Sequence, residues 1–190
     1  MENSAPGRLG PGMEAGWSAP PLSQELYASA YALRRSLSSM HDVGMAWVGQ
    51  RAATIAAAGV GSGGVSVLSV GSGQGDVDVH VIKSILDATR QDGRLLRYVA
   101  VDPSHAQCEL FRALLQEPPW PDDDAARLAL DIREERWPSS KGGATETFDL
   151  VLLVHVLYYF EDLSAALAAA HGCTGARRSG VHQVSHPAEE

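Results

Sequence analysis

Residues 65–76 constrain the fold of this chain more than any other stretch. A run of mostly β-branched apolar residues, Val65-Ser-Val-Leu-Ser-Val70, leads directly into three closely spaced glycines, Gly71, Gly73 and Gly75. A short apolar run that ends at glycines is typical of a buried parallel strand turning tightly into a helix. Glycine lets the backbone approach a ligand closely and adopts positive φ at little cost. The stretch therefore predicts a nucleotide-type binding turn at the carboxyl end of a first strand.

The residues around the glycines indicate which ligand fits. The dinucleotide fingerprint places its third glycine three residues after the second, where this chain has Asp76. A carboxylate at a helix N-terminus repels a diphosphate, and no Gly-Lys-Ser/Thr follows to form a P-loop. S-adenosylmethionine has no phosphate and carries a positive sulfonium, so Asp76 and Asp78 are compatible with it. We expect a methyl-donor site; a turn with a purely structural role and a nucleotide-dependent oxidoreductase are the alternatives.

A second acidic residue follows the next predicted strand. Tyr98-Val-Ala-Val-Asp102-Pro-Ser104 is a short apolar strand ending in an acid, and Asp102 lies 27 residues after Gly75. In open α/β sheets an acid in this place hydrogen-bonds a ribose diol. The alternative is that Asp102 only caps the helix that starts near Ser104, and the two roles are compatible.

Apolar patterns along the chain predict an α/β fold with a doubly wound, Rossmann-like parallel sheet. We expect two helices between residues 23 and 60, separated at His41 and Asp42, and further helices over 77–86, 106–115 and 162–170. Strands are expected over 65–70, 98–102, 127–130 and 148–154, with a loop over 117–124. The third strand is predicted to end at Asp131, where the donor's adenine amine would find an acceptor. A surface or capping role for Asp131 is the alternative.

The two ends of the chain differ in composition from its middle. Residues 1–22 are rich in Gly, Pro, Ser and Ala and are expected to be disordered. Residues 23–172 are expected to form the domain, with N-terminal helices over 23–60 and a partial core over 65–172. Residues 173–190 show neither a strand run nor a helical stripe and predict an irregular tail. The sheet would then be incomplete in its C-terminal half, with the strand over 148–154 as an exposed apolar edge.

Composition argues against several classes of function. A net charge of −8 without a Lys/Arg cluster argues against a nucleic-acid partner. The two cysteines have neither a disulfide framework nor a zinc spacing, so no metal site is predicted. The longest apolar run, residues 150–160, is too short to cross a bilayer, and the first residues lack the pattern of a secretory signal. We expect a cytoplasmic monomer with no membrane partner.

Three segments together resemble class I S-adenosylmethionine-dependent methyltransferases. They are Val67-Leu-Ser-Val-Gly-Ser-Gly-Gln-Gly-Asp-Val-Asp78, Val101-Asp-Pro-Ser104 and Val154-His-Val-Leu-Tyr-Tyr-Phe-Glu-Asp162. More narrowly, they are similar to the histamine N-methyltransferase family. That family has an acid-Pro-Ser motif after its second strand, a Leu-Tyr-Tyr motif after its fourth, and a Tyr-x-x-x-aromatic helix, here Tyr27 to Tyr31. The resemblance covers roughly residues 25–172.

The resemblance implies a binding site for S-adenosylmethionine as the cofactor. Gly71, Gly73 and Asp102 match positions that would hold its methionine part and ribose. Ser104 and Gln107 match further donor contacts, and Val154 would flank the adenosyl group. Gly75 and Asp131 complete the expected donor site on the patterns described above.

The resemblance also implies a small-molecule amine as the acceptor. His155, where the family has a glutamine, would line the acceptor pocket with Tyr158, Tyr159 and His41. The family's substrate-binding acid aligns with Met40, so a cationic amine would lose its countercharge unless the nearby Asp42 substitutes. Transfer would be in line to a neutral nitrogen, driven by placement and desolvation, with His155 taking the proton afterwards. A truncated, catalytically inactive isoform that at most binds the donor is the alternative.

Overall fold

The computed structural model describes residues 39–58, 64–138, 146–174 and 181–184, together with Ser23, Leu26, Ser29, Ala30 and Leu33. The chain divides into two compact units, Met1–Ser39 and Met40–Glu190. In the first unit, Ser23 Oγ accepts a hydrogen bond from the Leu26 N–H at 3.2 Å, and Leu26, Ser29, Ala30 and Leu33 are helical. This agrees with the helix predicted to start at Ser23. The predicted disordered segment, residues 1–22, lies outside the described residues.

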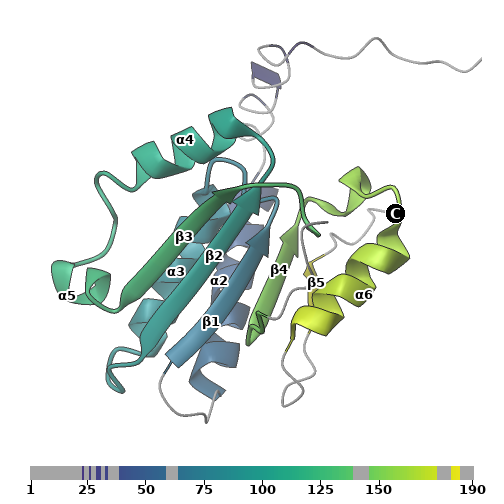
Figure 1. Ribbon diagram of the computed structural model, residues 1–190. Coiled ribbons are helices and arrows are strands. Elements are labelled where there is room, and N and C mark those ends of the chain that lie inside the picture. Colours follow the sequence, from purple (N-terminus) through teal and green to yellow (C-terminus); the bar gives the residue numbers. More distant parts are fainter. Residues whose placement is uncertain are drawn as a thin grey trace, which may run out of the picture. The chain divides into compact units, whose positions relative to one another are not determined.

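A parallel sheet forms the centre of the second unit (Figure 1). Its strands are β1 (Gly64–Val70), β2 (Leu95–Asp102), β3 (Leu128–Glu134), β4 (Leu150–Val154) and β5 (Val181–Val184). They lie in the order β3-β2-β1-β4-β5, and every pair is parallel. The strand order reverses between β1 and β4, which is where open α/β sheets bind ligands. The structure confirms the predicted doubly wound, Rossmann-like fold.

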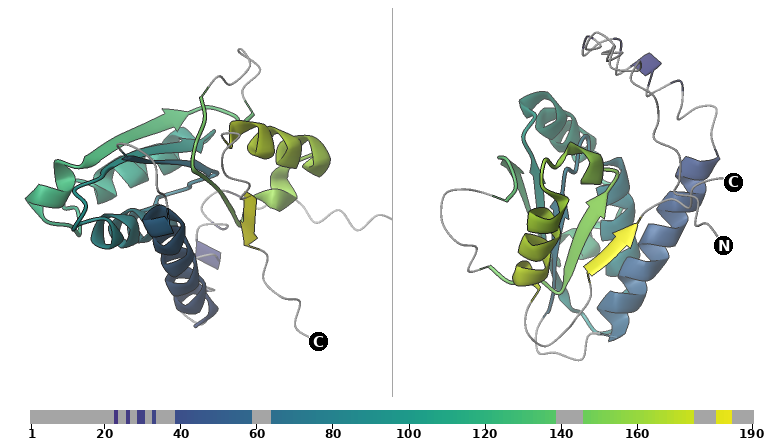
Figure 2. Two further views of the ribbon diagram at one scale, coloured as in Figure 1. Left: turned by 90° about the horizontal axis from the view of Figure 1, so that it is seen from below. Right: turned by 90° about the vertical axis from the view of Figure 1, so that its right-hand side faces the viewer.

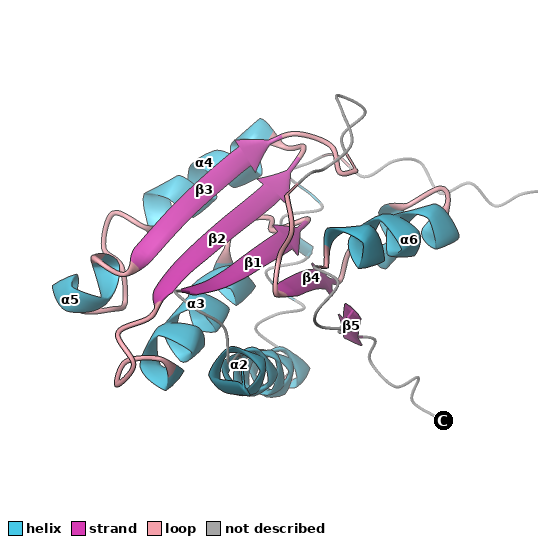
Figure 3. Ribbon diagram, turned by 60° about the horizontal axis from the view of Figure 1, so that its bottom comes forward, coloured by secondary structure: helices cyan, strands magenta, loops and turns pink. Residues whose placement is uncertain are grey.

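Helices cover both faces of the sheet. The helices α2 (Met40–Ala58), α3 (Asp76–Ala88) and α4 (His105–Leu114) lie on one face, and α6 (Leu163–Cys173) lies on the other (Figure 2). The short helix α5 (Asp122–Ala125) and the 3-10 turn η1 (Leu157–Tyr159) belong to the connections. Figure 3 shows the three longest strands side by side, with α3 and α4 behind them. Because all the strands are parallel, their carboxyl ends lie at the same edge of the sheet.

Side chains of β1 alternate between the two cores. Val65 and Val67 pack with α2 and α3, whereas Leu68 and Val70 belong to the core on the α6 face. Successive side chains of a strand point to opposite faces, and a strand covered on both faces is apolar almost throughout. Each buried Val or Leu contributes about 1.5–3 kcal/mol relative to an exposed one. The apolar run found in the sequence is thus explained by burial on both sides.

A buried ion pair network fixes the edge opposite to the glycines. Asp124 of α5 is 3% exposed and accepts hydrogen bonds from Arg90 and from Arg127, the latter at 2.6 Å. Arg127 also donates to the carbonyl oxygen of Leu86 at 2.7 Å and to that of Thr89 at 3.2 Å. These carbonyls belong to the last turn of α3, where a cation is favourable. The network therefore caps α3 and joins it to the start of β3.

The tail contradicts the prediction that it is irregular from residue 173. Thr174 pairs with Phe148, and β5 pairs in parallel with β4 from Val151↔Val181 to Val154↔Val184. The outer edge of β4 is covered, so the prediction of an exposed apolar edge is wrong. Val181-His-Gln-Val184 is too short and too polar to stand out as an apolar run.

The predicted helix break at His41 and Asp42 is also wrong. The helix α2 begins at Met40, so both residues lie in its first turn, where the carboxylate of Asp42 is favourable. The other end of α2 meets the amino ends of the strands, because Arg94 before β2 donates to the carbonyl oxygen of Ala56 at 3.0 Å. The start of α2 is therefore directed towards the carboxyl ends (Figure 2). None of the described helices combines the length and the apolar character needed to cross a membrane.

Candidate functional site

The glycine turn, residues 71–75, lies at the carboxyl end of β1. Gly71, Gly73 and Gly75 have φ angles of 69°, 57° and 86°, which residues with a side chain rarely adopt. The Gly71 N–H donates to the Val101 carbonyl at 2.8 Å, and the Gly75 N–H donates to the Ser72 carbonyl at 3.1 Å. The turn is thus closed on itself and fixed to the end of β2.

The three glycines differ in what surrounds them. A Cβ at Gly71 would lie 2.5 Å from Val156 Cγ2, and one at Gly75 would lie 2.2 Å from Phe111 Cδ2. Close packing against Val156, just after β4, and against Phe111 of α4 therefore requires glycine at both positions. At Gly73 the nearest atom to a Cβ would be Gln107 Oε1, at 3.7 Å. Of the three glycines, Gly73 is the one that leaves room for a ligand.

Asp102 joins the glycine turn to α4. Its Oδ2 accepts a hydrogen bond from the Gly73 N–H at 2.9 Å, and its Oδ1 accepts one from the Ser104 N–H at 2.8 Å. The N-cap of α4 is Ser104, whose Oγ accepts from the Gln107 N–H at 3.4 Å. Ser104 therefore caps this helix, and the interpretation of Asp102 as only a helix cap is not required. Each carboxylate oxygen has a second lone pair, so Asp102 can still accept the hydroxyls of a ribose.

Ser72 is a site residue that the sequence analysis missed. Its Oγ is buried and has no hydrogen-bond partner among the described residues. Leaving a buried hydroxyl unsatisfied costs about 1–3 kcal/mol. A bound ligand with a polar group at the turn would remove that cost. The only signal in the sequence is a hydroxyl placed between two glycines of the turn.

The carboxyl end of β4 brings the predicted acceptor residues to the glycine turn. Val154 is half-buried and packs against the core on the α2 and α3 side, and Val156 contacts Gly71. Between them, His155 is exposed and has a φ of 53°, a conformation of the kind found at ligand sites. Tyr158 and Tyr159 follow in η1, with ring centroids 4.5 Å apart and exposures of 68% and 63%. They form an open surface instead of the expected pocket wall. The side chain of His41 lies outside the described residues.

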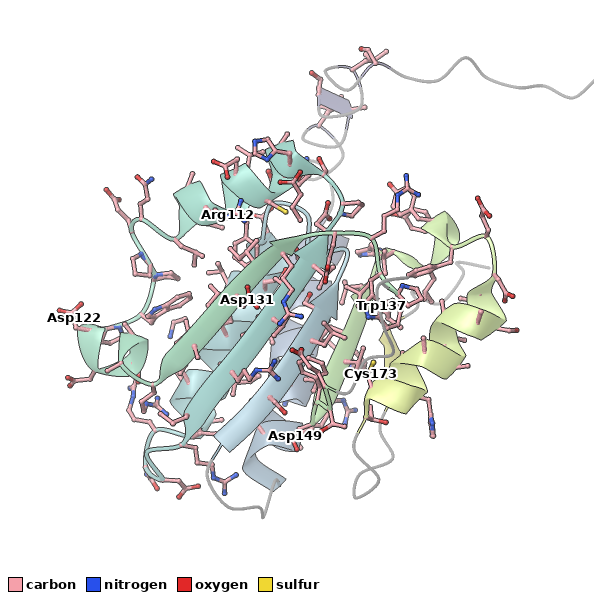
Figure 4. The ribbon with its side chains drawn as sticks, in the orientation of Figure 1. Arg112, Asp122, Asp131, Trp137, Asp149 and Cys173 are labelled. Atoms are coloured by element: carbon pink, nitrogen blue, oxygen red, sulfur yellow. The ribbon has the colours of Figure 1, made fainter. Side chains whose placement is uncertain are left out.

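The prediction that the third strand ends at Asp131 is wrong. β3 continues to Glu134, and Asp131 pairs in register with Val99 in the middle of β2. Its exposed carboxylate accepts a hydrogen bond from Arg133 Nε at 2.7 Å (Figure 4). The true end of β3 carries Glu134, which lies 2.8 Å from His105 Nδ1 and raises the pKa of His105. Asp131 therefore lacks the position for which an adenine contact was predicted.

A family model described as a methyltransferase domain matches residues 68–175. The match covers more than half of the chain, which therefore belongs to this family. It includes the end of β1, the glycine turn, Asp102 and the whole of β4. Membership confirms the predicted methyltransferase family and does not support the oxidoreductase alternative. Among curated protein sequences, none matches the chain significantly.

Two solved structures of one methyltransferase share the fold, and a third protein structure is similar over part of the chain. The plantazolicin methyltransferase BpumL in complex with SAH has a TM-score of 0.55 and 12% identity, covering 80% of this chain and 50% of BpumL. BpumL with a triazolic desmethylPZN analog and SAH gives 0.54 and 11% over the same shares. The YcgJ protein from Bacillus subtilis has a TM-score of 0.49 and 13% identity, covering 70% of this chain and 47% of YcgJ. The chain thus spans about half the length of each of these three structures. S-adenosylmethionine, the predicted cofactor, is consistent with this family and fold.

Proposed function

We propose that this chain carries out S-adenosylmethionine-dependent methyl transfer to a small-molecule amine, with the donor bound at the glycine turn. The observation that carries the proposal is the position of Asp102. Its carboxylate is held by the N–H groups of Gly73 and Ser104 beside the open space over Gly73. The site lies at the switch point of the sheet, in a family of methyltransferase domains.

The donor site uses both backbone and side-chain groups. Asp102 would accept hydrogen bonds from the ribose hydroxyls, and Ser72 Oγ would gain the partner that it lacks among the described residues. Gln107 places its Oε1 next to Gly73 and would contact the donor there, and Val154 would flank the adenosyl group. When bound, S-adenosylmethionine supplies an electrophilic methyl group together with a leaving group that departs as a neutral thioether.

The acceptor would approach from the end of β4 and η1. The attacking nitrogen must present a lone pair, so the residues of the chain need mainly to place and desolvate a neutral amine. Tyr158 and Tyr159 offer two aromatic rings for this purpose. His155 directly precedes Val156, the residue next to Gly71, and would accept the proton that the nitrogen releases once the new C–N bond has formed.

Met40 and Asp42 bear on which amine is accepted. The histamine N-methyltransferase family, which the chain resembles, has an acid at the position of Met40, ahead of His41. In this chain the first turn of α2, directed towards the site, has Asp42 as its acid, and Asp42 is exposed. An exposed carboxylate is a weak countercharge because water screens it. A neutral or weakly basic amine is therefore preferred over histamine.

Transfer of radiolabelled methyl groups to a panel of amines tests this function. The wild-type chain should methylate weakly basic amines with a higher kcat/KM than histamine. His155→Gln should change the order of preference, whereas His171→Gln, a matched change at an exposed position in the last turn of α6, should not. Efficient methylation of histamine would contradict the proposed specificity, and no transfer to any amine would contradict the proposed activity.

A further inference from the structure

A buried carboxylate lies directly below the glycine turn and has no role in the site described so far. Asp78, the third residue of α3, is 2% exposed. Its Oδ1 accepts a hydrogen bond from Tyr98 Oη at 2.9 Å, and its carboxylate is also hydrogen-bonded by the Ser69 side chain. Tyr98 itself is fully buried. We call these three residues the Asp78 cluster.

The Asp78 cluster joins the two ends of the glycine turn. Ser69 lies two residues before Gly71 in β1, and Asp78 lies three residues after Gly75 in α3. Tyr98 connects the cluster to the neighbouring strand β2. It lies four residues before Asp102, and the two side chains point to the same face of the sheet because side chains alternate along a strand. The cluster therefore links the strand before the turn, the helix after it and the neighbouring strand that ends at Asp102.

We infer that Asp78 is a positioning residue of the donor site, holding the glycine turn in place and favouring the positively charged donor over its uncharged thioether product. The inference rests on the proposed function. A buried charge is screened less than an exposed one and acts over a longer distance. Asp102, the acid proposed to bind the ribose, repels the charged form of Asp78 and so raises the pKa of Asp78, though by less than burial does.

The charge of Asp78 depends on pH in the neutral range. Burial raises the pKa of Asp78 to about 6, and repulsion by Asp102 adds to this, although the hydrogen bonds of Ser69 and Tyr98 oppose it. Asp78 is ionised at pH 7.5 and largely protonated at pH 5. A cationic donor favours the ionised form, so its binding should weaken as the pH falls.

Folding stability should respond to the same titration in the opposite sense. A carboxyl whose pKa is raised in the folded protein binds its proton more tightly there than in the unfolded chain. Between about pH 6 and pH 4 this group therefore makes the folded state more stable as the pH falls. As the pH falls, donor affinity should decrease while protonation of Asp78 makes the folded state more stable. A loss of affinity of this kind cannot be explained by unfolding. This contrast separates a positioning role from a merely structural one.

Other titratable groups lie around α3, including His80 in the helix itself, which every variant compared below retains. Burial beside Asp78 raises the pKa of Tyr98 further, so its hydroxyl stays neutral. In α2, which packs on α3, Asp42 and Arg51 are exposed, and Arg51 lies over the Trp47 ring at 5.5 Å. His105 beside Glu134 is the exposed group near the donor site whose pKa is raised. Its effect is removed by comparing variants that all retain it.

Titration calorimetry with S-adenosylmethionine and with S-adenosylhomocysteine tests the inference at pH 7.5, 6 and 5. For the wild type, the preference for the charged donor should fall about five- to tenfold between pH 7.5 and pH 5, as expected for one group titrating near pH 6. Asp78→Asn should abolish this fall and weaken donor binding at pH 7.5. Asp87→Asn, a matched change at an exposed position of the same helix, should behave as the wild type.

Tyr98→Phe provides a second variant that keeps the ring and removes only the hydroxyl. Losing that hydrogen bond raises the pKa of Asp78, so the fall in preference should begin at a higher pH. An unmoved midpoint would overturn the inference even if Asp78→Asn did not fold. The same preference in wild type and Asp78→Asn at every pH would overturn it and leave the donor site intact. If the wild type bound neither ligand, the result would contradict both the proposed donor site and the inference that rests on it.

Discussion

Gly73→Ala separates ligand approach from backbone strain in the glycine turn. At a φ of 57° any residue with a Cβ costs about 1–2 kcal/mol. The new methyl group would meet Gln107 Oε1 at 3.7 Å, an ordinary contact, so no packing cost is added. Each kcal/mol should lower Tm by about 2–4 °C in a domain of this size. The methyl group would, however, fill the space through which the donor reaches the backbone, so donor affinity should fall at least about tenfold, or 1.4 kcal/mol.

Gly93→Ala is the matched control for this change. Gly93 lies in the turn between α3 and β2, has a φ of 61°, and a Cβ there would have no atom within 4 Å. Thermal melting should show a similar loss of stability for both variants. Calorimetry with S-adenosylhomocysteine should show weaker binding only for Gly73→Ala. Equal affinities in the two variants would refute the claim that the space over Gly73 admits the donor.

Three further changes test the packing and strain at the site and the ion pairs at the opposite edge of the sheet. Gly75→Ala brings a Cβ to 2.2 Å from Phe111. In urea unfolding, this overpacking should lower the unfolding free energy by about 1–3 kcal/mol in addition to the cost of the backbone conformation. A second change, Phe111→Leu, should recover part of that loss. Asp124→Asn should cost about 1.5–3 kcal/mol because hydrogen bonds to its two arginine partners weaken. Since those partners lower the pKa of Asp124, its contribution is present above its ordinary pKa and should disappear as the wild type is acidified below about pH 4. His155 has a φ of 53°, which glycine adopts without strain. His155→Gly should therefore raise the unfolding free energy by about 1 kcal/mol while lowering methyl transfer. A loss of stability would contradict the claim that the backbone is strained at His155.

The central strands and the turn could be predicted because their signals are local. β1 is buried on both faces, so its sequence is apolar apart from Ser66 and Ser69, and the glycines that follow it have few alternatives. Asp102 could be placed for the same reason, since it directly follows a strand of this kind. The sequence therefore predicts those parts of the site that stand at the ends of buried strands.

The parts that were missed depend on long-range contacts. β3 has exposed positions and charged residues up to Glu134. Because its last residues do not form an apolar run, the sequence pattern predicts an end at Asp131. β5 is defined by its pairing with β4 and has only four residues. Ser72 was missed because its role depends on burial. Asp78 was named as compatible with a cationic donor, but its burial was not predicted, although it stands four residues before Ile82 on the buried stripe of α3.

Calorimetric titration of S-adenosylmethionine into the wild type and into Asp102→Ala tests the central claim most directly. The account predicts saturable binding by the wild type. It predicts a loss of about 1.5–3 kcal/mol in the variant, because charge-assisted hydrogen bonds to the ribose hydroxyls are removed. Circular dichroism must show that both proteins are folded. Unchanged affinity in Asp102→Ala would contradict the claim that the donor is held at the carboxyl end of β2.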